Sequence, residues 1–507
     1  MQKKIIFLVL ASLCWFSIAA FASEIRIGYT ADALSLDPAN HRERTTETII
    51  RNMFDGVLTR SSDMKIVPEL AESWQQLDSL TYEFKLRQGV KFHSGDEMTA
   101  DDIKFSLERV INEGALEGQT SPRKSLLGTL KEVKVIDPYK VHMILSEPWP
   151  ILPAFLPWHE IVSKKFAEKV GVKGMSTQAN GNGPFKLVQW DRGSQIVMER
   201  FNDYYGGAAD LEPVGAAQVD RLIWKIIPEN ASRVAALLSG NVDIINDLPV
   251  HSISQVNQSS NAKVLTVNGT RSFFSDFNHQ KAPFNNLLVR QAINHAVDVN
   301  LIIEKILGNR ATRLNGILSP NAFGHNPTLP EYSYDPEKAK SLLRQAGYPD
   351  GFSMTLDTVG AYKDLAEAVV SFLAPVGINA KVQVWESSVL KAKWLAEDNQ
   401  RDMWLSSWGN GSLDPVGLLV PKLRTKARGN YGKYSNAKID ELIDAANIEP
   451  NREKRAAYYQ TAESIINREA ALLFLWLPQE VYGVSKRLSG WVPSPDGRIN
   501  LHDAAIN

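Results

Sequence analysis

The sequence is almost free of cysteine. Its 507 residues contain only Cys14, which lies in an apolar amino-terminal segment that we expect to be removed. The mature chain is therefore expected to contain no disulfide, no cysteine nucleophile and no thiolate metal site.

An excess of charge of either sign is also missing. Lys and Arg together number 56, against 57 Asp and Glu, so no basic surface for nucleic acid and no acidic tail are predicted. Hydrophobic residues make up 44% and charged residues 22% of the chain, which is typical of globular proteins. The length allows two or three domains.

Common catalytic signatures are absent as well. The chain has no G-x-S-x-G, H-E-x-x-H, P-loop or G-x-G-x-x-G motif. Its nine histidines are scattered and form no pair at metal-ligand spacing. The glycine-rich runs 181–184 and 409–412 lack a following Lys-Ser/Thr, so they are interpreted as turns. We therefore predict no enzyme activity, no metal site and no cofactor.

Residues 1–22 have the layout of a secretory signal peptide. Lys3 and Lys4 precede an apolar run, and Ala20 and Ala22 precede a polar switch at Ser23. A membrane anchor is the alternative, but no basic stop signal follows the run. No other stretch is long and apolar enough to span a bilayer. We expect cleavage after Ala22 and a soluble, exported chain, and the lack of cysteine fits the bacterial periplasm.

Strand and helix patterns alternate along the whole chain. Residues 81–87 alternate apolar and polar side chains, as in a half-buried strand. Thr99 and Asp102 then resemble a capping box that starts a helix. Residues 364–374 show helical periodicity, and a strand pattern follows at 380–385, an order that favours a βαβ unit. These patterns predict a mixed α/β fold.

A series of ordered segments resembles the bacterial extracellular solute-binding proteins of family 5, the dipeptide, oligopeptide and nickel class. The most specific part is PELAESW at 68–74, with YEFKLRQGVKFHSGD at 82–96 and TADD at 99–102. Further similar segments are 183–187, 202–207, 233–240, 289–293, 339–349 and 434–443. From the side chains alone, these motifs are core packing, turns and helix caps, so they indicate the fold and not the ligand.

The resemblance implies a two-lobed periplasmic binding protein of type II with an extra subdomain inserted in lobe I. Lobe I is expected at residues 23–265, with the inserted subdomain at about 45–176, and the chain is expected to return to lobe I at 477–507. Lobe II is expected at 266–476. The two crossings between the lobes are then expected near 264–277 and 472–481.

The resemblance also implies a function. It implies the periplasmic binding component of an ABC importer for peptides or peptide-like solutes, which delivers ligand to inner-membrane permease subunits driven by an ATPase. Closure of the lobes on a ligand couples contacts from both of them to a shape that a permease can recognise. A monomer is expected. The alternatives are a non-peptide ligand (an opine, a glycoside or a nickel chelate) and a receptor or chaperone without transport.

Five residues are candidates for ligand contact. Trp404, Trp408 and Asn410 are spaced to share one strand face, and aromatic and amide groups suit broad polar ligands. Tyr29 and Asp32 belong to the loop after the first strand, where a cleft between lobes is expected. Core packing is the alternative interpretation for the tryptophans.

One position departs from the family pattern. In the family's peptide receptors, an aspartate three residues after the lobe II tryptophan resembles a counter-ion for the peptide amino terminus. Here that position is Gly411. A buried ammonium without a carboxylate is costly, so Asp32 is a candidate replacement. Asp414 precedes a proline and is expected to be structural, because Asp-Pro favours a turn.

Overall fold

The computed structural model describes residues 23–208 and 215–507. The predicted signal peptide, residues 1–22, lies outside this described part. Within it, none of the helices combines the length and the apolar character that crossing a membrane requires.

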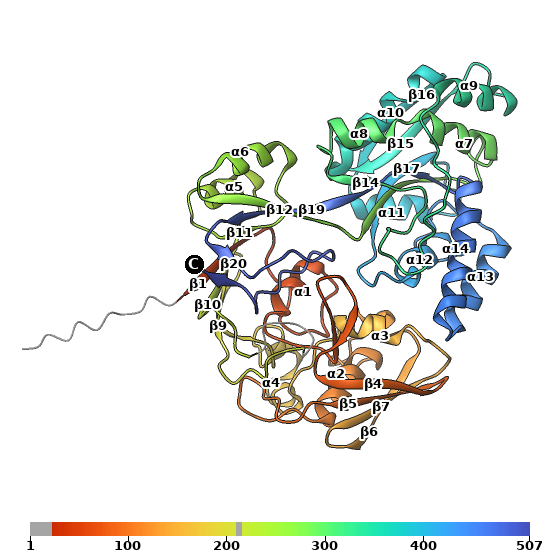
Figure 1. The fold of residues 1–507 in the computed structure, drawn as a ribbon. Coiled ribbons are helices and arrows are strands. Elements are labelled where there is room, and N and C mark those ends of the chain that lie inside the picture. The colour runs from red at the N-terminus through yellow and green to blue at the C-terminus, as the bar shows by residue number, and fades with distance from the viewer. Residues whose placement is uncertain (1–22, 209–214) are drawn as a thin grey trace, which may run out of the picture.

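Three large sheets organise the chain (Figure 1), here called sheet A, sheet B and sheet C. Sheet A has eight strands, sheet B five and sheet C four. In the view of Figure 1, sheet A lies on the left, sheet B with its helices at the upper right, and sheet C at the bottom. The molecule is a mixed α/β protein, as the alternating patterns predicted.

Sheet A collects strands from both ends of the chain. Its order is β12-β19-β11-β1-β10-β9-β8, and β14 pairs with β19 beside this path. The strands are β1 (Glu24–Tyr29), β8 (Phe185–Asp191), β9 (Gln195–Arg200), β10 (Arg221–Ile226), β11 (Ile244–Ile245), β12 (Ala262–Asn268), β14 (Ala311–Arg313) and β19 (Trp476–Ser485).

Sheets B and C differ in how their strands pair. Sheet B has the order β16-β15-β17-β13-β18 and contains the parallel pair β15–β16, whereas the pairs of sheet C, in the order β4-β5-β7-β6, are antiparallel. The strands of sheet B are β13 (Arg271–Phe277), β15 (Phe352–Val359), β16 (Ile378–Trp385), β17 (Met403–Gly409) and β18 (Leu472–Phe474). Those of sheet C are β4 (Ala71–Asp78), β5 (Thr81–Leu86), β6 (Leu130–Asp137) and β7 (Lys140–Leu145). Two small pairs complete the strands: β2 (Leu58–Arg60) with β3 (Ile66–Pro68), and β20 (Leu488–Ser489) with β21 (Ala505–Ile506).

Helices cover the sheets and form separate hydrophobic cores with them. The helices are α1 (Arg44–Ile50), α2 (Ala100–Ile111), α3 (Leu152–Phe155), α4 (Lys164–Met175), α5 (Asn230–Leu238), α6 (Ile253–Gln258), α7 (Leu287–Ala296), α8 (Val299–Lys305), α9 (Pro336–Gln345), α10 (Lys363–Ser371), α11 (Ser387–Leu395), α12 (Leu419–Leu423), α13 (Ala437–Ile448) and α14 (Arg452–Arg468). The inner strand β13 of sheet B is buried on both faces. Phe273 and Phe277 join a core with α7 to α10, and Phe274 joins one with α12 to α14.

The local patterns of the sequence produce the expected elements. In β5 the side chains of Tyr82, Phe84 and Leu86 are buried while the alternate positions are more exposed. Helix α2 begins with the capping box of Thr99 and Asp102, which satisfies backbone N–H groups that the first helical turn leaves free. The predicted helix and strand at 364–385 are α10 and β16, and β16 pairs in parallel with β15.

Two chain crossings join sheets A and B. Strand β12 of sheet A leads through Gly269 and Thr270 into β13 of sheet B, and β18 of sheet B leads through Leu475 into β19. The crossings touch where the Gly269 N–H donates to the carbonyl of Pro478 at 3.1 Å. In Figure 1, β12 and β19 span the space between the left and upper right parts. The residue limits of the lobes and of the inserted subdomain stay a prediction.

Candidate functional site

The loop after β17 lies where the regions of sheets A, B and C meet. Residues 409–412 continue from β17, and the Asn410 N–H donates to the carbonyl of Thr270, in the crossing between β12 and β13, at 2.8 Å. We call the surroundings of this loop the junction. It is defined by residues 409–412 together with the side chains that contact this loop or its flanking tryptophan.

Gly411 contacts an indole from the sheet C region. A Cβ atom at position 411 would lie 2.9 Å from Cζ2 of Trp158, closer than carbon atoms normally approach. Trp158 ends the short 3-10 helix Leu156–Trp158 and packs edge-on against Phe155 at 5.3 Å between ring centres. Trp158 therefore occupies the space that a side chain at position 411 would need, which gives a steric reason for glycine here.

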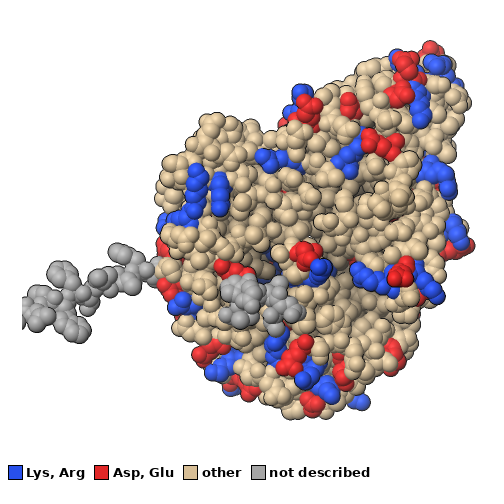
Figure 2. Space-filling view, viewed as in Figure 1, with Lys and Arg blue, Asp and Glu red and all other residues tan. Residues whose placement is uncertain are grey.

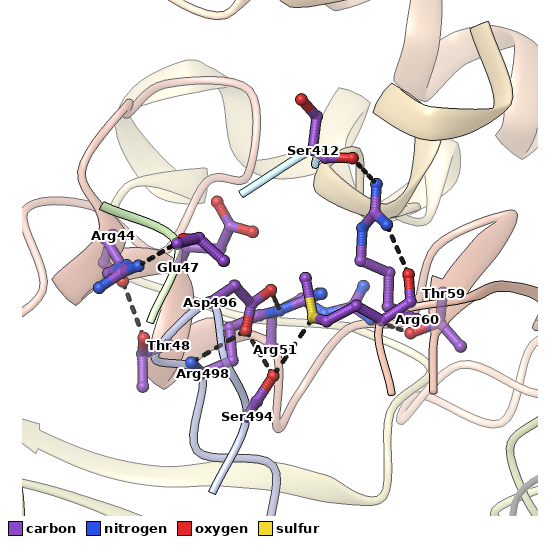
Figure 3. Close-up of polar contacts among 12 residues, drawn as sticks. Arg44, Glu47, Thr48, Arg51, Thr59, Arg60, Ser412, Ser494, Asp496 and Arg498 are labelled. Atoms are coloured by element: carbon purple, nitrogen blue, oxygen red, sulfur yellow. Dashed lines mark hydrogen bonds and ion pairs between the residues drawn. The ribbon is translucent and has the colours of Figure 1, made fainter. Parts of the chain in front are cut away.

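Arg60 forms a second contact across the junction (Figure 3). One of its Nη atoms donates to the carbonyl of Ser412 at 2.9 Å. The same atom donates to the carbonyl of Ala154 at 2.8 Å. Its other Nη atom donates to the carbonyl of Met64 at 2.8 Å. Burial lowers the pKa of Arg60 to about 10. A single side chain therefore ties the loop after β17 to the region of β2 and α3.

Two predicted residues are at the junction itself. Trp408 is half-buried, and its Nε1–H donates to the carbonyl of Gly417 at 2.9 Å. Asn410 is buried, and its Oδ1 accepts a hydrogen bond from Ser412 Oγ at 2.9 Å. Within the described residues, the Nδ2 atom of Asn410 has no hydrogen-bond partner. Since buried polar groups are normally paired, this amide is an available donor. Ligand contact by both residues stays a prediction.

Tyr29 and Trp404 are packed in hydrophobic clusters. Tyr29 is buried edge-on against Trp224, and burial raises its pKa well above the usual range. Trp404 is buried beside Trp394, with ring centres 5.8 Å apart, and beside Tyr431 at 4.7 Å. Their roles in ligand contact stay predictions, while the packing fits the core interpretation that the sequence also allowed for Trp404.

Asp32 is held by the hairpin of β8 and β9. Its carboxylate accepts hydrogen bonds from Trp190 Nε1 at 2.9 Å and from the Gly193 N–H at 2.7 Å. It also accepts from the Ala33 N–H at 2.8 Å. All three donors are neutral, and Asp32 has no cationic partner among the described residues. A counter-ion role for Asp32 stays a prediction and requires a ligand to approach this hairpin.

A second acid lies near Tyr29 and was not singled out from the sequence. Asp247 follows β11 with a positive φ of 51°, and its carboxylate accepts a hydrogen bond from Asn246 Nδ2 at 2.6 Å. Burial, and then the charge of Glu480, raise the pKa of Asp247. Glu480 itself pairs with Arg44 at 3.0 Å, and Arg44 also reaches Thr270 Oγ1 at 3.5 Å.

Two buried ion pairs lie beneath the junction. Lys422 Nζ is 2.7 Å from an oxygen of Asp276, and it lies 5.8 Å from the centre of the Trp408 ring. Arg455 contacts both oxygens of Asp414, each at 2.7 Å. The Asp414 carboxylate also accepts a hydrogen bond from the Val416 N–H at 3.1 Å. This arrangement fits the structural role predicted for Asp414.

Besides Arg60, the arginines of the junction without an acidic partner among the described residues are Arg271 and Arg428. Arg42, which contacts the sheet C region, has none either. Arg428 lies over the Trp408 ring, with its guanidinium carbon 5.0 Å from the ring centre. Arg42 donates to Ser125 Oγ at 3.0 Å and to the carbonyl of Pro122 at 3.2 Å. Arg271 donates to Ser407 Oγ at 3.3 Å. Burial lowers the pKa of Arg271, and the charge of Arg44 lowers it further.

Figure 2 shows acidic and basic side chains interspersed over the face of the molecule in view. The residues that the structure describes contain no group of three or more His, Cys, Asp or Glu side chains that could hold a metal ion.

Sequence reasoning missed Trp158, Arg42, Arg428 and Asp247. Each comes from a segment far from β17 in the sequence, and none belongs to a motif. The missing acid at Gly411 was the one signal that pointed to this place, and the structure shows the indole that occupies the space beside it. Together the junction offers aromatic surface, a free amide donor and unpaired cations, which suits a polar organic ligand.

Comparisons with known proteins agree with this architecture. The family model of bacterial extracellular solute-binding proteins, family 5 middle, matches residues 65–430. Heme-binding protein A of Haemophilus influenzae is 30% identical over 475 residues, covering 87% of this chain and 84% of the relative. The glutathione-binding protein GsiB of Salmonella paratyphi A is 26% identical and covers 97% of this chain and 96% of its own. The dipeptide-binding protein of Escherichia coli is 27% identical, with 87% and 86% covered.

Solved structures match along nearly the whole chain. The periplasmic binding protein DppA of Helicobacter pylori, in complex with the peptide STSA, superposes with a TM-score of 0.79 at 27% identity, covering 96% of this chain and 98% of that one. HbpA2 of Haemophilus parasuis gives a TM-score of 0.85 at 24% identity, covering 96% and 100%, which shows a shared fold. AgaA of A. tumefaciens in complex with agropinic acid gives 0.76 at 26% identity, with 96% and 99% covered.

Proposed function

Since the chain belongs to the bacterial extracellular solute-binding proteins of family 5, we propose that it is the periplasmic binding component of an ABC importer for peptides or peptide-like solutes. The observation that carries the proposal is the junction. The loop after β17 contacts the crossing strand through Thr270, the sheet C region through Trp158, and β2 through Arg60.

A ligand bound at such a place contacts more than one region at once. Its binding free energy then favours the arrangement in which these regions are together, because a ligand shifts a conformational equilibrium by its differential affinity for the two states. The two crossings between sheets A and B are the connections around which such a movement can occur. A membrane permease can recognise the resulting shape.

Peptide-like solutes suit the chemistry of the junction. At the junction, unpaired arginines can receive a carboxylate and the free Asn410 amide can donate to a peptide carbonyl. Outside the junction, Asp247 or Asp32 can receive an ammonium. The named relatives that bind a dipeptide, glutathione or the peptide STSA support this ligand class.

The proposed function also implies how the protein is exported, its oligomeric state and its partners. The chain is exported through a signal peptide that is cleaved after Ala22, acts as a monomer, and has no catalytic activity of its own. Its partners are permease subunits in the inner membrane and their ATPase. Its lobes have the predicted limits, with lobe I at 23–265 and 477–507 and lobe II at 266–476.

A thermal-shift screen of residues 23–507 tests the ligand class. The panel contains di- to pentapeptides, glutathione, an opine, an oligosaccharide and a nickel–histidine chelate. A ligand at one hundred times its Kd adds about 2.7 kcal/mol to the stability of the native state, which raises the melting temperature measurably. We expect a shift with peptides or glutathione.

The other members of the panel are the controls. A shift with the opine, the sugar or the chelate, and none with any peptide, contradicts the peptide proposal. A ligand-bound protein that binds no permease in reconstituted membranes contradicts the transport role and favours a receptor or chaperone.

A further inference from the structure

A cavity of about 420 Å³ lies beside β18, the edge strand of sheet B. Its walls come from α7, α9 and α14, at the right of Figure 1, and from residues 326–332, which we call the cavity loop. Tyr332 of this loop stacks on Phe474 of β18, with ring centres 6.3 Å apart. Strand β13 separates β18 from β17, and the residues that line the cavity all differ from those of the junction. The cavity is therefore a second candidate site, and its volume is in the range of about 300–1,000 Å³ that small-molecule sites have.

The cavity loop is fixed to α14 by hydrogen bonds. Asn326 Nδ2 donates to Ser464 Oγ at 2.9 Å. Asn467 Nδ2 donates to the carbonyl of Pro330 at 3.0 Å, and the Tyr332 hydroxyl donates to the carbonyl of Asn467 at 2.7 Å. The chain itself thus forms this wall of the cavity, so a ligand would have to order little of it on binding.

The charges of the lining favour an anion. Lys338 of α9 and Arg468 of α14 are exposed and have no acidic partner among the described residues. The acid of the lining is Glu331, whose carboxylate lies 3.5 Å from Arg313 Nε. A guanidinium group presents a planar fork of N–H donors that matches the two oxygens of a carboxylate. A carboxylate is therefore the anion that we expect beside Arg468.

His295 of α7 adds a hydrogen-bond acceptor to the lining. Its side chain is buried, and its Nδ1 lies 2.8 Å from the carbonyl of Ser333. Because a carbonyl only accepts, Nδ1 carries the proton, and in the neutral ring Nε2 is then an acceptor. Burial lowers the pKa of His295, which keeps the ring neutral near neutral pH. Since Nε2 has no hydrogen-bond partner within the described part of the chain, it can accept from an O–H or N–H group of a ligand.

Apolar surface completes the lining, and it comes from Leu329, Pro330, Tyr332 and Leu342. We propose that this cavity is a second binding site, for a small organic carboxylate that has an apolar body and a hydroxyl or N–H donor. The carboxylate binds Lys338 and Arg468, the apolar body packs against the cavity loop and α9, and the donor bonds His295 Nε2. This site goes beyond the proposed function, because its residues are separate from those of the junction.

Calorimetry with three related compounds tests the proposal on the mature chain. Para-hydroxyphenylacetate carries the carboxylate, the ring and the hydroxyl. Para-hydroxyphenylacetamide lacks the charge, and phenylacetate lacks the hydroxyl. Hydrogen bonds to charged groups are the stronger ones, so the amide should bind roughly tenfold or more weakly than the hydroxy acid. Loss of the neutral hydrogen bond should weaken the binding of phenylacetate by roughly threefold.

Substitutions in the lining locate the bound compound. Arg468→Gln and Lys338→Gln should each weaken the binding of the hydroxy acid by roughly tenfold. Both side chains are exposed, so the melting temperature without ligand should stay unchanged. Arg344→Gln is the matched control, because Arg344 is also exposed on α9 but does not line the cavity. This variant should bind the hydroxy acid as the wild type does.

Three results overturn the proposal. The first is the absence of binding by the hydroxy acid, and the second is equal affinity for the acid and the amide. The third is binding that Arg468→Gln and Lys338→Gln leave unchanged or that Arg344→Gln weakens equally, since the compound would then lie elsewhere or respond only to net charge. Each of these results leaves the proposed import function intact, because the peptide panel tests that function at the junction.

Discussion

Charged side chains are used differently beneath the junction and at its surface. Beneath it, Lys422 with Asp276 and Arg455 with Asp414 are buried in matched pairs. At the surface, Arg428 is exposed and has no acidic partner among the residues described. A desolvated charge requires a partner, whereas water can solvate an exposed one until a ligand displaces it. The pairing of charges therefore separates residues that hold the fold from those free to bind.

The largest expected effect comes from breaking a buried pair. Asp414→Ala leaves the Arg455 guanidinium buried without its carboxylate, and should lower the free energy of unfolding by about 3–5 kcal/mol. Urea denaturation measures this loss. Asp444→Ala breaks an exposed pair with Arg424 and should lose at most about 1 kcal/mol. Equal losses in the two variants would remove the distinction between buried and exposed charges.

A buried acid that lies beside a half-buried histidine, with no lysine or arginine paired to it among the described residues, should make the stability depend on pH. His325 Nδ1 lies 3.7 Å from the carboxylate of Glu463, and burial lowers the pKa of His325. Glu463 is fully buried in α14, and burial raises its pKa to about 7. In the unfolded chain a glutamate titrates at about 4.3, so between these values the folded state binds more protons and stability falls as the pH rises. Glu463→Gln should reduce the loss of unfolding free energy between about pH 5 and pH 8 by about 2–3 kcal/mol.

Urea denaturation at several pH values checks this prediction for Glu463. The control is Glu337→Gln, because Glu337 is exposed on α9 and its substitution should leave the pH dependence unchanged. Parallel curves for the wild type and Glu463→Gln would contradict a raised pKa at this position.

Substitution of Gly411 should lower the stability by a smaller amount, and this loss should depend on the presence of Trp158. Gly411→Ala places a Cβ atom 2.9 Å from the indole, and overpacking of this kind lowers stability by about 1–3 kcal/mol. The loss should shrink in a Trp158→Phe background, where the indole is absent, and a double-mutant cycle in thermal unfolding measures the coupling. Gly360→Ala is the control, since nothing lies within 4 Å of a Cβ atom there. Additive losses would show that the two residues do not constrain each other.

The smallest expected effect on stability is that of substituting the exposed Arg428. Arg428→Gln should change the free energy of unfolding by no more than about 0.5 kcal/mol, because the side chain is exposed and unpaired. The same urea titration used for Asp414→Ala measures it. A loss as large as that of Asp414→Ala would place Arg428 among the residues that hold the fold.

Local order in the sequence predicted much of the fold. Three predictions that depend only on neighbouring residues are confirmed. They are the strand at 81–87, the capping box of Thr99 and Asp102, and the helix before β16. The resemblance to family 5 is also confirmed, and it implied the two-lobed fold that the matching structures share. These features could be predicted from the sequence because periodicity, helix caps and family motifs are properties of short segments.

The candidate site was harder to predict from the sequence, because its residues come from segments that are far apart along the chain. Trp404 and Trp408 have the same strand parity, yet Trp394 of α11 covers the first, while the second is half-buried beside Arg428. Nothing in the spacing of β17 indicates which tryptophan a helix will cover. The sequence did indicate that position 411 was unusual, but the indole that fills the space belongs to a segment in another region.

Strand β19 pairs with different strands along its two halves. Its residues 479–485 pair with β12, and 476–478 pair with β14, which leads away from the helices around sheet B. A continuous ladder of this kind resists sliding, because any shift along the strand breaks every hydrogen bond together, but it tolerates twisting. The two ladders of β19 meet at Pro478, whose carbonyl accepts a hydrogen bond from the Gly269 N–H. We therefore expect a change in the angle between the two parts to be taken up near this residue, so that under the proposed function the bound state would differ from the empty one by a rotation.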